Sequence, residues 1–325
     1  VLSVSRVGIH DSFFELGGDS IKALQVSARL AAEGWSMTIQ DLFRYPTVHE
    51  LSGHITPLTS QAEQRPIEGE ADLTPIQNRF FDQRHAFRDH YNQSVMLFSE
   101  KGFHADALRQ ALRKLTEHHD ALRMVFTQNH AGRVVQYNRG IQITENELFG
   151  LHVADWTKEQ AKGTLLEEKF AAEEIVLQSN MNVKEGPLLQ AGLFKTIEGD
   201  HLLITIHHLA VDGVSWRILL EDVAAAYQQS LEQTEIKLPP KSDSYLSYAN
   251  GLAQIAGSRQ LLSEITYWQT TLDAHNVFLP KDRAESDRHQ SSAETAAFVL
   301  ASDWTKKLLF ETQQAYGTDA NELLL

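Results

Sequence analysis

The stretch from His201 to Trp216, HLLITIHHLAVDGVSW, constrains the fold of this chain more than any other. Leu202 to Ile206 is a short run of apolar and β-branched residues, which predicts a buried strand. Asp212 and Gly213 then form a turn signal, and the residues from Arg217 onward carry apolar side chains at helical spacing. Two adjacent histidines therefore stand where a buried strand ends, just before a loop that leads into a helix.

These two histidines, His207 and His208, are expected to point in opposite directions, because successive side chains of a strand face opposite sides of the sheet. Only one of them can therefore reach a given cavity. Two interpretations stay open: both are structural, or one is a general base, a role that suits a histidine near neutral pH. A metal site fits poorly, since adjacent strand residues do not converge on one ion and the chain has no cysteine.

The charge of the chain argues against two classes of partner. The chain has 29 Lys and Arg residues against 43 Asp and Glu residues, a formal net charge of −14. This balance repels nucleic acid and anionic membranes, so we expect neither as a partner. No apolar run approaches the ~18 residues that span a bilayer, and the first residues lack the layout of a signal peptide. We therefore expect a cytoplasmic protein.

The first 51 residues have the pattern of a small helical unit. Ile21 to Ala32 carries apolar residues along one stripe, and Ser20 stands at or next to the N-cap of that predicted helix. Asp19 or Ser20 could simply cap exposed amides, as both residue types often do. Alternatively, a phosphate ester belongs here, because a helix N-terminus attracts anions and Gly17 and Gly18 leave the approach open.

The letters HHLAVDGVSW at 207–216 resemble the HHxxxDG core of the condensation superfamily in nonribosomal peptide synthetases. Ser215 and Trp216 resemble the variant of this core that epimerization domains carry. LTPIQ at 73–77 resembles the first epimerization motif, PIQxWF, although Arg79 stands where that motif has Trp. HHDALRMVF at 118–126 resembles the second motif, and GPLLQAGLF at 186–194 resembles the strand that precedes the histidine strand.

The letters DSFFELGGDSI at 11–21 resemble the attachment motif of a peptidyl carrier domain. In that family the motif serine carries 4′-phosphopantetheine, so the resemblance assigns this cofactor to Ser20. Asp19, directly before it, resembles carriers that work with an epimerization partner. The resemblance implies a carrier at residues 1–51 that lacks its first helix, followed by a polar linker at 52–72.

The resemblance also implies the fold of residues 73–325. We expect an epimerization domain with the two-lobed α/β fold of chloramphenicol acetyltransferase, its first lobe at about 73–243. The second lobe would begin at about 244 and be incomplete at 325. The fold class is thus a small all-α carrier joined to a two-lobed α/β domain.

The activity that the resemblance implies is inversion at Cα of an aminoacyl or peptidyl thioester held on the pantetheine arm. His208 would face the channel as the catalytic base, while His207 would point into the lobe. We expect Asp212 to be a buried structural carboxylate paired with Arg123, since a buried charge needs a partner. Ser215 would have a supporting role. Trp216 is expected to pack in the floor of the site rather than only anchor its helix, and no metal is expected.

Two alternatives have different functions: a condensation domain that forms peptide bonds, and a non-catalytic module that docks carriers. The implied partners are an adenylation domain upstream, a condensation domain downstream and a pantetheinyl transferase. The family places a second catalytic group, a glutamate, in a later EGHGRE-type motif that this sequence does not contain. Asp319 and Glu322, the carboxylates nearest the end of the sequence, have the spacing of a helix-capping pair, so we expect them to be structural. With no second catalytic group, residues 1–325 alone are expected to be inactive.

Periodicity predicts the remaining elements. We expect His118 and His119 to be capping or surface residues near a helix end. The predicted strands are 91–98, 133–137 and 296–300, and the predicted helices are 104–118, 158–178, 244–272 with a break near Gly257, and 303–316.

Overall fold

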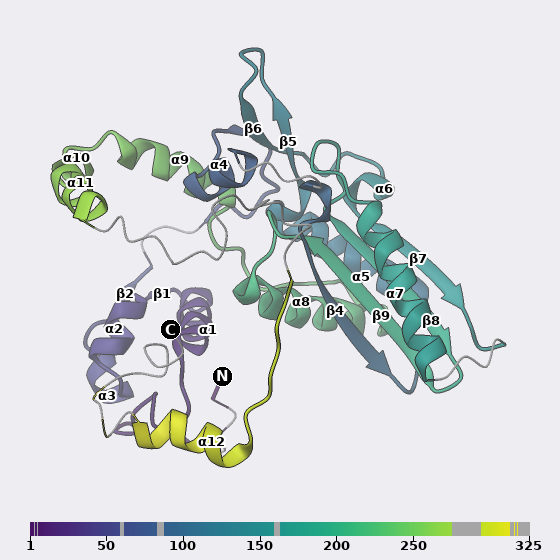
Figure 1. The fold of residues 1–325 in the computed structure, drawn as a ribbon, viewed down its shortest axis with the longest axis horizontal. Coiled ribbons are helices and arrows are strands. Elements are labelled where there is room, and N and C mark those ends of the chain that lie inside the picture. Colours follow the sequence, from purple (N-terminus) through teal and green to yellow (C-terminus); the bar gives the residue numbers. More distant parts are fainter. Residues whose placement is uncertain are drawn as a thin grey trace. The chain divides into compact units, whose positions relative to one another are not determined.

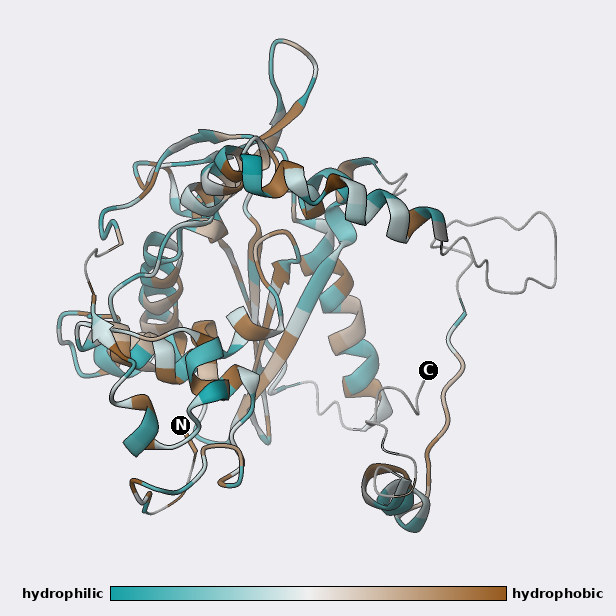
Figure 2. Cartoon of the chain, turned by 90° about the vertical axis from the view of Figure 1, so that its left-hand side faces the viewer, coloured by the Kyte–Doolittle hydropathy of each residue, from teal (hydrophilic) through white to brown (hydrophobic). Residues whose placement is uncertain are grey.

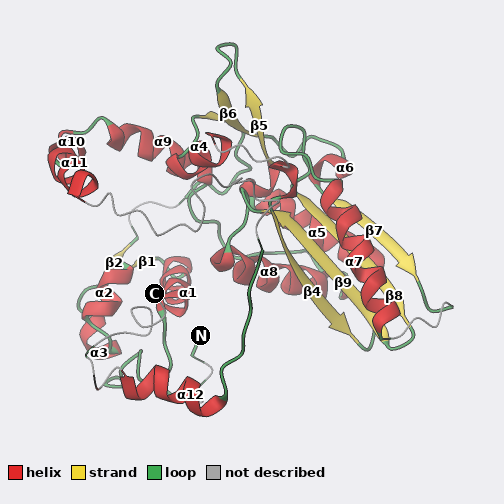
Figure 3. Cartoon of the chain, viewed as in Figure 1, coloured by secondary structure: helices red, strands yellow, loops and turns green. Residues whose placement is uncertain are grey.

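The computed structural model describes residues 1–325 except 3, 5, 59–61, 83–87, 159–162, 275–293, 313–314, 316 and 318–325. It divides into two units, residues 1–277 and residues 278–325. Figure 1 traces the elements in chain order, and Figure 3 separates helices from strands. Among the described residues, every helix is too short or too polar to cross a membrane.

The N-terminal elements form a small helical bundle with its own core. They are α1 (Ser20–Ala32), β1 (Trp35–Ser36), α2 (Ile39–Arg44), α3 (Val48–Leu51) and β2 (Thr56–Pro57), with β1 and β2 paired antiparallel. The core consists of apolar side chains from these helices and the preceding loop: Phe13, Ala23, Met37, Leu42 and Leu51. The helical carrier-like fold expected for this part is therefore present.

Two glycines shape the turn that precedes α1. Gly17 has φ +83°, a left-handed conformation that glycine adopts without strain. At Gly18 a side chain would collide with both the ring and the carbonyl oxygen of Phe13. This close approach lets Phe13 enter the core and lets α1 begin immediately afterwards.

A four-stranded sheet forms the centre of the larger domain. Its order is β4-β9-β8-β7; β9 pairs antiparallel with β4 and β8, and β7 pairs parallel with β8. Helices α5 and α8 cover one face and α7 packs against the other (Figure 1). The bounds are β4 (Asn92–Ser99), α5 (Ala105–His118), β7 (Gly150–Asp155), α7 (Thr164–Ser179), β8 (Leu189–Thr196), β9 (Gly199–His207) and α8 (Gly213–Leu231).

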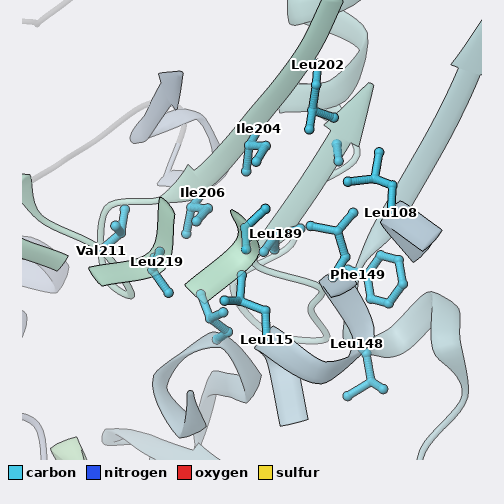
Figure 4. Packing of buried hydrophobic residues seen from close by; sticks show 14 of the residues in the cluster. Leu108, Leu115, Leu148, Phe149, Leu189, Leu202, Ile204, Ile206, Val211 and Leu219 are labelled. Carbon is cyan, nitrogen blue, oxygen red and sulfur yellow. The ribbon is translucent and has the colours of Figure 1, made fainter. Parts of the chain in front are cut away.

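The main core lies between this sheet and helices α5 and α8. Leu202, Ile204 and Ile206 of β9 face it, as alternation along a strand requires, and Figure 4 shows them beside Leu108 of α5 and Leu219 of α8. Leu203 points to the opposite face, where Phe194 and Trp156 pack with α7. Figure 2 shows helices with both hydrophilic and hydrophobic stretches, as expected for elements that are buried on one side.

A second, three-stranded sheet has the order β3-β6-β5 and is antiparallel throughout. Its first strand lies within residues 52–72, the segment expected to be a linker, so the end of that segment belongs to a sheet. The elements around it are β3 (Gly69–Ala71), α4 (Pro75–Asp82), η1 (Arg88–His90), η2 (Asp120–Arg123), β5 (Met124–Gln128), β6 (Val134–Asn138) and α6 (Glu145–Leu148).

The later part of the chain departs from two predictions. Residues 244–272 form three helices instead of two: α9 (Tyr245–Ala256), α10 (Arg259–Ser263) and α11 (Ile265–Ala274). The strand predicted at 296–300 is wrong, because these residues pair with no other described strand, and their apolar side chains are exposed. The helix predicted at 303–316 is observed as α12 (Ser302–Lys306) and a π-helical turn, η4 (Lys307–Glu311), and its last residues lie largely outside the described part. Asp319 and Glu322 also lie outside the described residues.

Candidate active site

His207 is the last residue of β9 and His208 directly follows it, and the two have different surroundings. The backbone N–H of His207 donates to the carbonyl of Leu188 (2.9 Å), and that of His208 donates to the carbonyl of Tyr91 (2.8 Å). The side chain of His207 is fully buried, whereas His208 lines a cavity. The two side chains thus have the different surroundings that were expected, although β9 ends at His207 and His208 lies in the turn that follows.

The cavity beside His208 has a volume of about 500 Å³, within the usual range for small-molecule sites. It lies between the end of β9, helix α4 and the start of α9. Arg79, which replaces the Trp of the first motif, is one of its lining residues. The full lining is Ile76, Gln77, Arg79, Phe80, Tyr91, His208, Leu209 and Tyr245.

Both ring nitrogens of His208 have hydrogen-bond partners. Nδ1 lies 2.7 Å from the carbonyl oxygen of Val211, and Nε2 lies 3.2 Å from Nε2 of Gln93 on β4. The ring also stacks on Tyr91, with centroids 4.9 Å apart and planes at 23°. The imidazole is thus held from three sides at the rim of the cavity.

His207 is held by the backbone. Its Nε2 donates to the carbonyl oxygen of Arg88 (2.8 Å), and its Nδ1 accepts from the N–H of Leu209 (3.1 Å). Burial lowers the pKa of His207, so the neutral form is favoured there. These contacts join the histidine loop to the segment before β4, which fits a structural role.

Asp212 is exposed and does not pair with Arg123, so the predicted buried ion pair is wrong. Asp212 is the N-cap of α8: its Oδ1 accepts from the N–H groups of Val214 (3.1 Å) and Ser215 (2.8 Å) and from the hydroxyl of Ser215 (2.7 Å). Partial desolvation opposes ionisation of the exposed Asp212, but the hydrogen bonds from Ser215 and Val214 outweigh it and lower its pKa. Ser215 thus supports the loop by bonding to the capping carboxylate.

Arg123 pairs with Asp120 instead. The Arg123 side chain is 0% exposed, and its Nη2 lies 2.5 Å from Oδ1 of Asp120. Its Nη1 donates to the carbonyls of Thr116 and Glu117, at 2.6 and 2.9 Å. Arg123 therefore joins the end of α5 to η2 and lies in a different hydrogen-bond network from Asp212. The predicted pairing of Arg123 with Asp212 is wrong because Asp120, the acid nearest to Arg123 in the sequence, binds it instead.

Trp216 packs in the main core with Val211 and Leu219 and is 8% exposed. Its indole Nε1 donates to Oε1 of Gln93 (2.9 Å). Trp216 is not among the residues that line the cavity, so its expected place in the floor of the site stays a prediction, and its polar contact was not predicted. Sequence reasoning missed Gln93 and Tyr91 as site residues. The register of β4 with β9 brings Gln93 to His208, and the carbonyl of Tyr91, directly before β4, accepts from the backbone N–H of His208.

Ser20 and Asp19 stand at the start of α1. Oδ1 of Asp19 accepts from the N–H groups of Ile21 (2.9 Å) and Lys22 (2.8 Å), and these backbone hydrogen bonds help to lower its pKa. Asp19 is thus the cap, while Ser20 is the first helical residue and is exposed. An exposed hydroxyl at a helix start gives a phosphoester room, so the local structure fits a pantetheine arm on Ser20.

The second histidine pair stands at the end of α5. Nε2 of His119 lies 2.6 Å from Oδ2 of Asp222 on α8, and burial lowers the pKa of His118 to about 4. His119 is therefore an interhelical contact as well as a cap, not a free surface residue. Within the described part of the chain, His118, His119 and Asp222 are the one group whose ligand atoms could surround a metal ion, lying within 4.8 Å of one another.

Comparison with protein families defines the class of this chain. A model described as a condensation domain matches residues 67–325, and one described as a phosphopantetheine attachment site matches residues 1–55. The chain belongs to the condensation-domain family of nonribosomal peptide synthetases, here preceded by a carrier domain. Such a carrier holds 4′-phosphopantetheine on a serine.

Individual relatives agree with this class. The chain is 73% identical over 326 residues to one of the plipastatin synthase proteins of Bacillus subtilis (strain 168), and 44% identical over 328 residues to tyrocidine synthase 2 of Brevibacillus parabrevis. Both alignments include all of this chain but only 13% and 9% of those proteins. The chain thus corresponds to a small part of each relative's length.

Solved structures support the fold. The epimerization domain from the third module of tyrocidine synthetase B is 43% identical with a TM-score of 0.70, covering 81% of this chain and 58% of that one. The starter condensation domain of rhizomide synthetase, in a mutant form, has a TM-score of 0.52 at 20% identity, covering 64% of this chain and 49% of that one. The α/β fold predicted for the larger domain is confirmed.

Proposed function

We propose that this chain is part of an epimerization domain of a nonribosomal peptide synthetase, and that the full-length protein inverts Cα of an aminoacyl or peptidyl thioester. The main observation is that His208, directly after β9, lines a cavity of suitable size. The Ser215-Trp216 ending and the 43% identity to a solved epimerization domain support epimerization over condensation.

The chemistry of the substrate explains the need for such a histidine. When bound, the pantetheine arm supplies a thioester, whose carbonyl makes the α-proton acidic. His208 would remove that proton, since a positioned imidazole is an effective base near neutral pH. Val211 and Tyr91 would keep the ring in place during the transfer. Ser20 would carry the arm, and a pantetheinyl transferase would attach it.

The wider context follows from the same proposal. An adenylation domain upstream would supply the aminoacyl group, and a condensation domain downstream would use the inverted product. The second candidate function is peptide-bond formation by this domain, which the condensation-domain match favours. The two functions differ in whether the α-proton of the tethered substrate exchanges with solvent.

The test uses the full-length protein with its pantetheine arm, loaded with an L-aminoacyl or L-peptidyl group in deuterated water. We expect deuterium at Cα and a mixture of both configurations, and we expect His208→Ala to abolish both. His130→Ala, which changes an exposed histidine, is the matched control and should behave as wild type. Peptide-bond formation without α-proton exchange would support the condensation alternative instead.

A further inference from the structure

A directed row of hydrogen bonds leads from the second sheet to the cavity of the candidate site. The backbone N–H of Thr74 (2.9 Å) and its hydroxyl group (3.1 Å) both donate to Oε1 of Gln77. Nε2 of Gln77 donates to Oε1 of Gln136 (3.1 Å), and Nε2 of Gln136 donates to the carbonyl oxygen of Asp72 (2.8 Å). At the other end, Oγ1 of Thr74 lies 3.0 Å from the phenol oxygen of Tyr245, a residue that lines the cavity.

Both side-chain amides in this row are oriented by backbone groups. The N–H of Thr74 can only donate, so the oxygen of the Gln77 amide must face it. The carbonyl of Asp72 can only accept, so the NH₂ group of Gln136 must face it. A flip of either amide would set donors against donors and acceptors against acceptors. Thr74, Gln77 and Gln136 are at most 3% exposed, so water cannot relieve such a mismatch.

The hydrogen of the Tyr245 hydroxyl is therefore committed to Thr74. A threonine hydroxyl has one hydrogen, and that of Thr74 is donated to Gln77. Oγ1 of Thr74 then accepts from Tyr245, which leaves the phenol oxygen with lone pairs and no further hydrogen to donate. Burial raises the pKa of Tyr245 and outweighs the opposing effect of the hydrogen bond to Thr74, so the phenol keeps its hydrogen at neutral pH.

We propose that Tyr245 is a substrate-binding residue whose phenol oxygen accepts an N–H group of the tethered thioester. This inference rests on the proposed function, which places such a substrate in the cavity. Two N–H groups stand near the reacting carbon: the one on Cα and the nearest amide of the pantetheine arm. The thioester carbonyl is not a partner for this oxygen, because a carbonyl only accepts hydrogen bonds.

The same directions distinguish Tyr245 from a proton donor. A tyrosine with a free hydrogen in this cavity would be a candidate to protonate the enolate on the face opposite His208. Here such a donation would either withdraw the hydrogen from Oγ1 of Thr74 or turn the hydroxyl of Thr74 away from Gln77. Each change breaks a hydrogen bond of a buried residue, which costs free energy. Tyr245 therefore binds the substrate without supplying a proton.

The test measures binding by calorimetry to the full-length protein without its pantetheine arm, so that the cavity is free. The parent probe is N-acetyl-L-alanyl pantetheine in which a CH₂ group replaces the thioester sulfur, which prevents hydrolysis and keeps the carbonyl. In two further probes an ester oxygen replaces either the N–H on Cα or the nearest N–H of the arm. We expect the wild type to bind one of these esters about 3- to 10-fold more weakly than the parent, as loss of one hydrogen bond implies.

Tyr245→Phe completes a cycle with these probes. It should weaken binding of the parent probe by a similar factor and should not further weaken the ester that lacks the recognised N–H. The identity of that ester shows whether the N–H belongs to Cα or to the arm. Tyr248→Phe is the matched control, because Tyr248 lies on the same helix, is 55% exposed and stands outside the described lining of the cavity. Equal weakening of all three probes by Tyr245→Phe would overturn the inference, as would tighter binding of both esters than of the parent by the wild type.

Thr74→Val tests the direction of the row. Valine removes the acceptor of the Tyr245 hydrogen, so the hydroxyl can then donate into the cavity. The preference for the parent probe over the weaker ester should therefore shrink, whereas Thr74→Ser should keep it. Thermal unfolding shows whether each variant folds, and the Tyr245→Phe cycle decides alone if Thr74→Val does not. An unchanged preference in a folded Thr74→Val would contradict the assigned directions.

Exchange of the α-proton separates this inference from the proposed function. In the loaded full-length protein, Tyr245→Phe should slow exchange by less than about 10-fold, whereas loss of a proton donor costs about 100-fold or more. A loss of that size with unchanged probe binding would make Tyr245 the proton donor and overturn the inference. Absence of exchange in the wild type, with the expected probe preferences present, would overturn only the proposed function.

Discussion

Asp120 lies between two buried cations: its Oδ1 is 2.5 Å from Nη2 of Arg123, and its Oδ2 is 2.9 Å from Nζ of Lys241. The Lys241 side chain is 8% exposed and that of Asp120 is 6% exposed. Oδ1 of Asp120 also accepts from the backbone N–H of Ile67 (3.0 Å). One carboxylate therefore joins η2 to segments 53 residues before it and 121 residues after it.

This arrangement predicts an asymmetry between mutations. Asp120→Asn leaves two buried cations without a counter-charge, and we expect a loss of about 3–5 kcal/mol in the free energy of unfolding. Lys241→Met leaves the Asp120–Arg123 pair in place and should cost clearly less. Denaturant unfolding of both variants measures the difference. Equal losses for the two variants would contradict the central position of Asp120.

The cap of α8 predicts a pH-dependent contribution from Asp212. Asp212→Ala should lower the free energy of unfolding by about 1 kcal/mol, whereas Asp212→Asn, which can still cap, should cost less. The folded-state pKa of Asp212 lies below its ordinary value of 3.8, so its charge stabilises the fold above that pH and the contribution is lost as the pH falls through the folded-state pKa. Wild type and Asp212→Asn should therefore converge in stability in strong acid. A difference between them that stays constant with pH would contradict the assignment.

His118 predicts acid sensitivity in a milder range. Burial lowers its pKa from 6.5 to about 4, so between these values the unfolded chain binds a proton that the folded chain does not. Stability should fall as the pH drops from 6.5 to 4, by at most about 3 kcal/mol and by less because His118 is only partly buried. His118→Gln should reduce this slope, whereas His130→Gln, at an exposed position, should not. Unchanged pH dependence in His118→Gln would mean that the ring is more hydrated than its position indicates.

The sequence predicted the elements that depend on local pattern. The apolar run at 202–206 correctly predicted β9, and the different surroundings expected for His207 and His208 are observed. Helix α8 begins four residues earlier than predicted, at Gly213 instead of Arg217, because Asp212 caps it. Asp212 and Gly213, which were interpreted as a turn, are therefore the start of a helix. The preference of Asp for the N-cap position also allows this interpretation.

Long-range pairings were not accessible in the same way. The partner of Arg123 is local, since Asp120 stands three residues earlier in the same helix η2, and sequence reasoning overlooked it. The place of Gln93, in contrast, depends on the register between β4 and β9. A shift of one residue in that register would turn Gln93 away from His208. The contact between Gln93 and His208 leaves no periodic pattern in the amino-acid sequence. The roles of His208 and Ser20 and the domain boundaries at 51, 72 and 243 stay predictions.

The last prediction concerns attachment of the pantetheine arm. Ser20 is exposed at the first position of α1, with Asp19 already occupied as the cap, so its hydroxyl is the one we expect to be modified. Treatment with coenzyme A and a pantetheinyl transferase should raise the intact mass by one arm, and Ser20→Ala should prevent the increase. Ser27→Ala is the matched control, because Ser27 lies on the same helix but bonds to the carbonyl of Met37. It should still gain the arm. A mass increase in Ser20→Ala would place the attachment at another serine and would remove the link between the glycine turn at Gly17 and the cofactor.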